Sequence, residues 1–388
     1  MRRRYCLLLG TAAVILASAG LTSAMVPEDI LTIRTAEAGD LSPDGRYLLY
    51  SIGVWNGDTD QRDRTLFRRD LDTGKDLVVF TPEDNSWGAV WRPDGTAIAY
   101  LRQTDAGSEV WIMAADGADR QRISAGTGSF GPLHWAPDGS ALAWAKSART
   151  GPYEGVDGQY LVADRLGYRH LGEGYRRGKL GQLFVMDLAN GQPRRLVEAN
   201  LDVRSLSWSP DSRELVFEAK ADTNLGLNLN SDLFIVGRGG GEIRQITTNG
   251  GPDSSPLWLD NGHIAWMRSE DPIWESSPRT ISVMSPEKGD QGPLEVHGQN
   301  LDTNFRRWAE HEGHFYALAA RKGALELVQL DGGKQKWLTN FQHDFWSFQL
   351  GGNRVVLQGP SQTHPGAIYA VDLAEKTMGP HRPRAVVD

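Results

Sequence analysis

The sequence is almost free of cysteine, and it has fewer basic residues than acidic ones. Cys6 is the only cysteine among 388 residues, so no disulfide can form within the chain, and a domain of this size must be held together by its apolar core. The chain has 41 Lys and Arg against 49 Asp and Glu, a net charge of −8. This balance argues against nucleic acid or an anionic membrane as the main partner.

Long apolar runs are also missing after the first 24 residues. Those residues begin with Arg2, Arg3 and Arg4, continue as an apolar run from Cys6 to Leu21, and end in small residues at Ala24. This order is typical of a secretory signal peptide, so we interpret residues 1–24 as a signal that is cleaved after Ala24. It predicts a periplasmic or secreted protein with no membrane span after cleavage. An uncleaved membrane anchor is the alternative.

Helical periodicity is missing as well, whereas Gly and Pro are abundant, with 44 and 19 residues. Many of them belong to a repeated phrase, an aromatic or apolar residue followed by x-Pro-Asp-Gly and an apolar strand. Pro, Asp and Gly in this order predict a tight turn between two strands. Clear and eroded copies of this anchor phrase begin at Leu41, Trp91, Trp135, Trp208, Trp258, Trp308 and Phe348.

The anchor phrases recur every 40 to 50 residues, except for the longer interval between Trp135 and Trp208. Each unit also contains a second hairpin, and four short strands per unit at this spacing predict blades around an axis. We therefore predict an all-β fold, a seven-bladed β-propeller with four antiparallel strands per blade, over residues 41–376. Residues 25–40 are expected to be a lead-in segment, residues 151–182 an insertion in the third unit, and residues 377–388 a short C-terminal tail.

Tryptophan content by itself does not indicate a carbohydrate site in this chain. Five of the 13 tryptophans occupy the same position of the repeat, namely Trp91, Trp135, Trp208, Trp258 and Trp308. A large ring at a repeated position is expected to pack between neighbouring blades.

The anchor phrase, together with the segment Leu183-Phe-Val-Met-Asp-Leu-Ala-Asn-Gly191, resembles the propeller repeats of TolB and of the prolyl oligopeptidase family. The insertion contains Asp164-Arg165-Leu-Gly-Tyr168-Arg169 and then Gly172-Glu173-Gly174-Tyr175. It is similar to the segment at this place in the acylaminoacyl-peptidase branch, as is the opening from Pro27 to Arg34. The resemblance covers roughly residues 26–375 and implies the N-terminal propeller of such a peptidase.

The chain departs from that family in the part that performs catalysis. The resemblance implies an α/β-hydrolase domain with a Gly-x-Ser-x-Gly turn and then Asp and His, and no such turn occurs in this sequence. The nearest imitation, around Ser129, has Thr127 in place of the first Gly and precedes an anchor phrase, so it is expected to be a blade loop. We expect no catalytic residue, and therefore no enzyme activity of this chain alone.

The insertion is the predicted binding site. Its cations, phenols and carboxylate are the groups that hold the ends of a peptide, and the residues expected to bind are Arg165, Tyr168, Arg169, Glu173 and Tyr175. The alternative is a solvated flap whose charges pair with each other. A weaker candidate is the polar stretch from Asp222 to Asn230. His311 and His314 lie in an eroded turn and are expected to face solvent, so no metal and no cofactor are predicted.

These observations favour a secreted, non-catalytic propeller that binds a peptide or protein partner, including a separate hydrolase domain. A TolB-like periplasmic scaffold, a fragment of a full-length serine peptidase and a metal-dependent propeller enzyme remain as alternatives. The ring is expected to close by packing between the first and seventh blades, unless residues 26–34 pair with the last blade.

Overall fold

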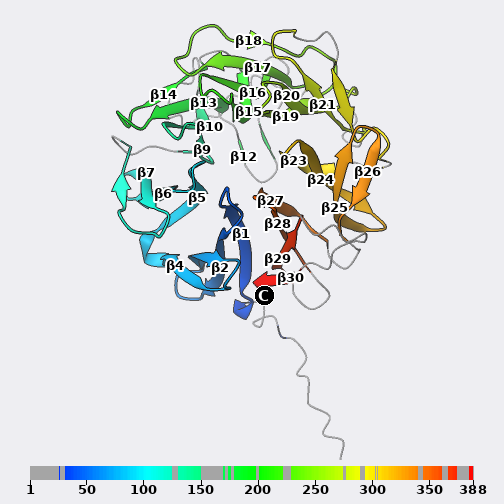
Figure 1. Cartoon of the computed structure of the whole chain (residues 1–388). Coiled ribbons are helices and arrows are strands. Elements are labelled where there is room, and N and C mark those ends of the chain that lie inside the picture. Colours follow the sequence, from blue (N-terminus) through cyan, green and yellow to red (C-terminus); the bar gives the residue numbers. More distant parts are fainter. Residues whose placement is uncertain are drawn as a thin grey trace, which may run out of the picture.

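A computed structural model shows four-stranded antiparallel sheets arranged in a ring around a central opening (Figure 1). Seven such sheets are present, so the predicted seven-bladed β-propeller is confirmed. The structure describes residues 26, 31–124, 130–149, 169–170, 174–175, 179–197, 201–221, 229–273, 277–288, 293–301, 303, 305–339, 344–360, 366–373 and 384–387. No helix in these ranges is long and apolar enough to cross a membrane. The predicted signal peptide lies outside them.

In each blade the strands pair in chain order, and the first strand lies nearest the axis. Blade one contains β1 (Thr35–Leu41), β2 (Tyr47–Asn56), β3 (Gln61–Asp70) and β4 (Asp76–Phe80), and the short 3-10 helix η2 (Pro82–Asp84) leads to the next blade. Blade two contains β5 (Ser86–Trp91), β6 (Ala97–Thr104), β7 (Gly107–Ala114) and β8 (Gln121–Arg122). Blade three contains β9 (His134–Trp135), β10 (Ala141–Arg149), β13 (Lys179–Asp187) and β14 (Pro193–Arg195).

Blade four contains β15 (Leu201–Trp208), β16 (Glu214–Ala221), β17 (Asp232–Gly237) and β18 (Arg244–Gln245). Blade five contains β19 (Asp253–Trp258), β20 (Ile264–Arg268), β21 (Thr280–Met284) and β22 (Glu295–His297). Blade six contains β23 (Phe305–His311), β24 (His314–Arg321), β25 (Ala324–Asp331) and β26 (Lys334–Trp337). Blade seven contains β27 (Ser347–Gly351), β28 (Arg354–Gly359), β29 (Ala367–Asp372) and β30 (Arg384–Val387).

The anchor phrases form the turns between the first and second strands, as predicted. Gly95 has a φ of 71°, which a residue with a side chain rarely adopts, and its N–H donates to the carbonyl of Arg92. Asp94 accepts a hydrogen bond from the N–H of Thr96 at 3.0 Å, which fixes the exit from the turn. The same pattern recurs around Gly139, so the repeat encodes one turn geometry.

The apolar core lies between the blades. Each of the seven buried clusters found in the described residues combines side chains from two neighbouring blades. The repeated tryptophans belong to these clusters, and the indole N–H groups of Trp135 and Trp208 donate to backbone carbonyls of the preceding blade, at Val90 and His134. The predicted role of these rings is confirmed, although Trp308 is only partly buried.

The two faces of the ring carry different connections. Because successive strands are antiparallel, all turns between first and second strands lie on one face, which we call the turn face. The opposite face carries the connections between second and third strands and the passages from one blade to the next. The insertion joins β10 to β13, so we call this side the insertion face.

Two predicted boundaries of the propeller were wrong. Thr35–Leu41, assigned to the lead-in, forms the innermost strand of blade one, and Arg384–Val387, assigned to the tail, pairs with β29 as the outermost strand of blade seven. Neither segment carries a turn phrase, so strand pairing rather than local pattern places them. The insertion is also shorter than predicted, because the ladder of β10 and β13 extends to the pair of Arg149 and Lys179.

The ring closes without exchanging strands. All strands of blade one precede those of blade two in the chain, and blade seven is built from the last four strands. β1 packs beside blade seven in Figure 1, and their shared cluster combines Leu41 and Tyr50 with Val356 and Ile368. Blades one and seven therefore pack against each other, and Gln358 adds hydrogen bonds to the backbone of β1. Residues 27–30 lie outside the described residues, so pairing of the opening segment with blade seven stays an open alternative.

Candidate functional site

The insertion forms a hairpin on the insertion face. Its two short strands, β11 (Arg169–His170) and β12 (Gly174–Tyr175), pair antiparallel, with Arg169 opposite Tyr175. Figure 1 shows β12 over the central opening of the ring. A hairpin at this place is positioned to meet anything that approaches the axis from the insertion face.

The structure places only the backbone of two predicted binding residues. Arg169 and Tyr175 face each other across the hairpin, whereas Arg165, Tyr168 and Glu173 lie outside the described residues. The binding role of these five residues therefore stays a prediction. The stretch 222–228, the weaker candidate, and Ser129 also lie outside the described residues.

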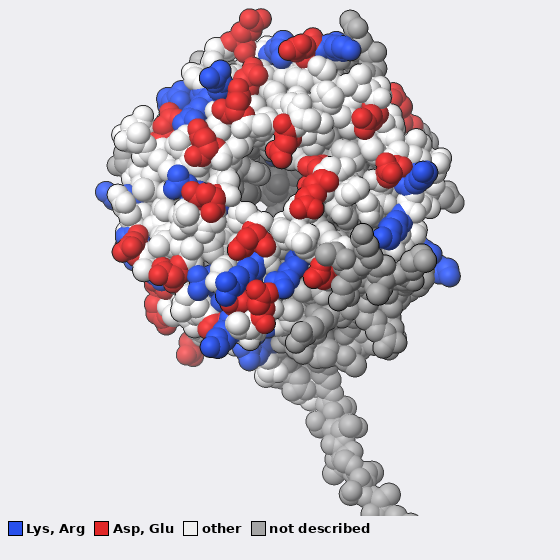
Figure 2. All heavy atoms as spheres, viewed as in Figure 1, with Lys and Arg blue, Asp and Glu red and all other residues white. Residues whose placement is uncertain are grey.

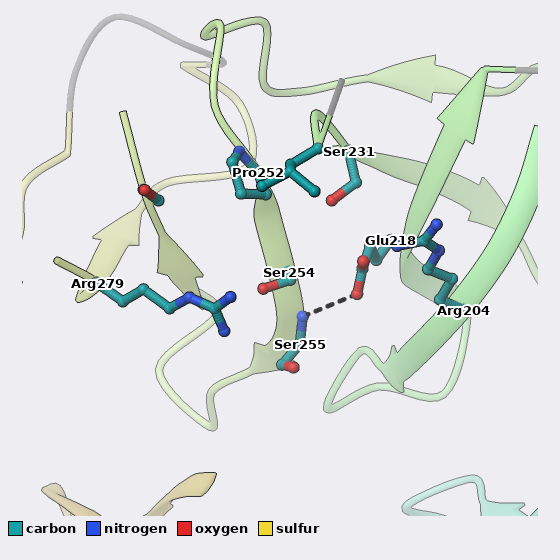
Figure 3. Close-up of a pocket in the computed structure, with 9 residues that line it drawn as sticks. Arg204, Glu218, Ser231, Pro252, Ser254, Ser255 and Arg279 are labelled. Carbon is teal, nitrogen blue, oxygen red and sulfur yellow. Dashed lines mark hydrogen bonds between the residues drawn. The ribbon is translucent and has the colours of Figure 1, made fainter. Parts of the chain in front are cut away.

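A pocket that the sequence did not predict lies on the insertion face, between blades four and five (Figure 3). Its volume is about 480 Å³, within the range of roughly 300–1,000 Å³ that is usual for small-molecule sites. We call it the junction pocket, and it is lined by Arg204, Glu218, Leu229, Ser231, Pro252, Ser254, Ser255, Ser269 and Arg279. These residues come from three strands, β15, β16 and β19, and from the connections beside β17, β20 and β21, so no local sequence motif indicates the pocket.

Glu218 forms one wall of the junction pocket. Its side chain is only 6% exposed, and its Oε2 atom accepts hydrogen bonds from the Ser205 hydroxyl at 2.8 Å and from the Ser255 N–H at 3.2 Å. Ser205 belongs to the same blade and Ser255 to the next one, so the carboxylate bridges the two blades. The second carboxylate oxygen, Oε1, has no hydrogen bond recorded with the described residues.

Two arginines contribute positive charge to the pocket. Figure 3 shows the guanidinium of Arg279 extending toward Ser254 and Ser255, opposite the wall formed by Glu218 and Arg204. Arg204 is 44% exposed and lies 3.9 Å from Asp202. Arg279 is half-buried, and one of its N–H groups points to the sulfur of Met267 at 3.9 Å.

Hydroxyl groups complete the lining. Ser269 is 4% exposed, and its Oγ atom has no hydrogen-bond partner among the described residues. A buried hydroxyl without a partner costs free energy, so a polar ligand that reached it would recover a hydrogen bond. Ser255 has a φ of 52°, in the left-handed region, within a bulge of β19, and this conformation directs its N–H to Glu218.

A buried carboxyl lies beneath the pocket. Asp253 has no exposed surface, and its Oδ1 atom accepts the indole N–H of Trp266 at 2.7 Å. Burial raises the pKa of Asp253 to about 7, against the opposing effect of the hydrogen bonds from Trp266 and Thr247. Asp253 directly precedes Ser254, which lines the pocket.

His311 and His314 lie opposite each other at the turn between β23 and β24. His311 is within 2.5 Å of the Gly352 carbonyl in blade seven, and His314 faces it across the turn and is exposed. Among the described residues, no group of three or more His, Cys, Asp and Glu side chains could hold an ion. The prediction that both histidines face solvent is wrong for His311, because the neighbouring blade covers it.

No protein-family model matches the chain. It is 24% identical over 395 residues to dipeptidyl-peptidase 5 of Porphyromonas gingivalis, covering 93% of this chain and 57% of that protein. It is 26% identical over 221 residues to the uncharacterized peptidase YuxL of Bacillus subtilis, covering 54% of this chain and 33% of that protein. The chain thus spans about half the length of the dipeptidyl-peptidases that it matches.

Solved structures show the same fold. An acylaminoacyl peptidase in complex with Z-Gly-Gly-Phe-chloromethyl ketone superposes with a TM-score of 0.71 at 15% identity, covering 91% of this chain and 52% of that one. The β-propeller domain of the trilobed protease from Pyrococcus furiosus, described as having an open velcro topology, gives a TM-score of 0.61 at 13% identity and covers 96% of that chain. The resemblance to the N-terminal propeller of prolyl oligopeptidase family members is therefore confirmed.

Proposed function

We propose that this chain is a non-catalytic propeller that binds peptides on its insertion face, as the substrate-gating part of a serine peptidase of the dipeptidyl-peptidase 5 type. The observation that carries the proposal is the similarity to such peptidases over 93% of this chain but only 57% of the relative. In the peptidase family that this chain resembles, the catalytic nucleophile belongs to the hydrolase domain and not to the propeller. The residues of this chain would then select and hold the peptide, and a hydrolase domain would cleave it.

The geometry of the insertion face supports this role. The inserted hairpin, the junction pocket and the starting point of β1 lie on this face, and the last strand β30 runs toward it. A hydrolase domain joined to or docked on this face would meet the groups that can hold a peptide. By contrast, the face seen in Figure 2 shows acidic side chains from several blades around the central opening, which supports a partner other than nucleic acid.

We further propose that the protein works in the periplasm or outside the cell. The basic start, the apolar run and the small residues before Met25 support this location. Determination of the N-terminal residue of the protein purified from its native host tests the proposal. A mature protein that begins with Met25 is expected, whereas retention of Met1 in a cytoplasmic fraction would contradict it.

Removal of the insertion tests the binding role. A variant in which residues 150–178 are replaced by Asn-Gly should fold normally, because the ladder of β10 and β13 ends at Arg149 and Lys179 and this dipeptide favours a hairpin turn. We expect its melting temperature to change by less than about 3 °C, as for a surface loop. Binding of short peptides with free or blocked ends, measured by calorimetry, should fall at least tenfold.

A fluorophosphonate probe for serine hydrolases provides the matching test of catalysis. The isolated chain is expected to stay unlabelled, because no Gly-x-Ser-x-Gly turn is present. Labelling would contradict the non-catalytic role. Unchanged peptide binding in the shortened variant would place the binding surface elsewhere than the insertion.

A further inference from the structure

The first strand of blade six carries two consecutive arginines on a bulge. The ladder of β23 and β24 shifts its register between Phe305 and Arg307, so Arg306 is an extra residue in the strand. Phe305 and Trp308 both pack in the apolar cluster between blades five and six, although residues three positions apart in a regular strand face opposite sides. The bulge therefore turns Arg306 and Arg307 away from that cluster, and both side chains are exposed.

These two guanidinium groups have no counter-charge. Among the described residues, neither Arg306 nor Arg307 has a hydrogen bond or an ion pair. By contrast, Arg204, the extra residue in the bulge of β15, lies 3.9 Å from Asp202, and the bulges of β1, β5 and β19 contain no Lys or Arg. Adjacent like charges repel each other, so an anion bound beside both guanidinium groups would be stabilised by each of them.

The two arginines lie beside the central opening. β23 is the innermost strand of its blade, and Arg306 is its second residue, at the end of the strand on the insertion face. Trp346 directly precedes β27, the innermost strand of blade seven, which contacts β23. Its side chain is 45% exposed, and its indole ring lies against Gly366. Arg306, Arg307 and Trp346 thus form a surface at the insertion-face end of the opening, which we call the mouth patch.

Building on the proposed peptide-binding function, we propose that the mouth patch binds an acidic segment of a peptide, in which two neighbouring side-chain carboxylates contact Arg306 and Arg307. A planar guanidinium matches a carboxylate with two parallel hydrogen bonds. The exposed indole of Trp346 offers apolar area to the methylene groups of the same segment. The net charge of −8 disfavours a polyanion as long as a nucleic acid strand, so the complementary ligand is a short run of Glu or Asp.

The experiment compares two tetrapeptides whose ends are both blocked. Acetyl-Ala-Glu-Glu-Ala-amide and acetyl-Ala-Gln-Gln-Ala-amide, which differ in the charge of two side chains, are titrated by calorimetry into the full chain. We expect the acidic peptide to bind the wild type about tenfold more tightly in low-salt buffer, and this preference should shrink at high salt. The double variant Arg306→Gln/Arg307→Gln should lose the preference and bind the glutamine peptide like the wild type. Trp346→Ala should weaken binding of both peptides alike.

A matched control separates this effect from loss of folding or of general charge. Arg213 lies on the turn face and its side chain is 83% exposed, so Arg213→Gln should bind both peptides like the wild type. Because Arg306 and Arg307 are exposed and have no partner among the described residues, the double variant should keep its melting temperature within about 2 °C. If it does not fold, each single variant should still lose part of the preference for the acidic peptide.

Equal binding of the two peptides by the wild type would overturn the mouth patch assignment and leave the proposed function standing, whereas the absence of binding by either peptide would contradict both. A preference that survives in the double variant, or that is lost equally in Arg213→Gln, would also overturn the assignment. Acetyl-Ala-Gln-Gln-Ala with a free carboxyl terminus tests the source of the carboxylate. If it binds as tightly as the acidic peptide, the chain terminus is recognised and the assignment to acidic side chains falls.

Discussion

Two junctions between blades can be compared: the one between blades four and five, and the one that closes the ring between blades seven and one. Each contains a side chain that is hydrogen-bonded to the backbone of the next blade, a carboxylate in the first junction and an amide in the second. In both, a side chain on the second strand of one blade lies opposite a serine of its own blade and accepts a hydrogen bond from the next blade. Glu218 accepts the N–H of Ser255, and Gln358 accepts the N–H of Ala38 at 3.1 Å. Both N–H groups lie three residues before an anchor phrase.

The difference between an amide and a carboxylate decides what each junction can do. The amide of Gln358 also donates, to the carbonyl of Ala36 at 2.7 Å, so it ties β1 to β28 in the manner of a strand ladder. Glu218 can only accept, and the corresponding carbonyl of Asp253 receives its hydrogen bond from Ser231 instead. The apolar clusters have seven and eight buried members, so apolar packing does not distinguish the junctions. At the closing junction Gln358 thus both donates to and accepts from β1, whereas Glu218 accepts only and lines the junction pocket.

The largest expected effect is on the amide bridge. Gln358→Leu removes the side-chain hydrogen bonds to the partly buried N–H of Ala38 and the buried carbonyl of Ala36, at up to about 1–3 kcal/mol for each group left unpaired. We expect a loss of about 2–4 kcal/mol in the free energy of unfolding, measured by urea denaturation with tryptophan fluorescence. The exposed Gln335 of blade six is the control, and Gln335→Leu should have little effect. A similar loss of unfolding free energy in both variants would show that the hydrogen bonds of Gln358 have no special role in closing the ring.

A smaller effect, dependent on pH, is expected at the other junction. The pKa of Asp253 is raised to about 7 from an ordinary value of 3.8, so between these values the folded protein holds a proton that the unfolded chain has released. The contribution of Asp253 to the free energy of unfolding is therefore fully present at about pH 4 and below. It decreases as the pH rises to about 7 and is lost at higher pH. Ala36 occupies the corresponding position at the closing junction, so no such titration is expected there.

Asp253→Asn tests this expectation, because the amide resembles the protonated acid and keeps an acceptor for Trp266. Compared with the wild type, the variant should be similarly stable at pH 4.5 and more stable at pH 8, by a few kcal/mol at most, since each pKa unit corresponds to about 1.4 kcal/mol. Urea unfolding at the two pH values measures the difference. Other carboxyls with raised pKa values, such as Asp40, are present in both proteins, so their effects on stability cancel when the variant is compared with the wild type. An equal change at both pH values would show that Asp253 acts through packing.

The smallest effect is expected from the segment before the ring. Among the described residues, the hydrogen bonds of Gln358 across the closing junction begin at Ala36, so we expect removal of residues 26–34 to shift the melting temperature by less than about 3 °C. Removal of residues 26–41 also deletes β1 and should prevent the ring from closing. Differential scanning calorimetry of the two shortened chains makes the comparison. A large drop for the shorter deletion would show that residues 26–34 contribute to closure.

The sequence by itself determined the architecture, because the repeat is a local signal. The clear anchor phrases specify their turns through Pro, Asp and Gly, and the spacing of all copies indicates the number of blades. The same signal located the tryptophans between blades. It did not reveal β1 or β30, since these segments become strands only by pairing with blades that are already formed.

Only the tertiary structure decided where the polar chemistry gathers. Glu218 and Arg279 are 61 positions apart and belong to no motif, but neighbouring blades bring them to one pocket. Likewise, nothing local distinguishes Gln358, which closes the ring, from the exposed Gln335. The physical reason is that turns and strands are specified over a few residues, whereas hydrogen bonds and charges between blades depend on how whole sheets pack against each other.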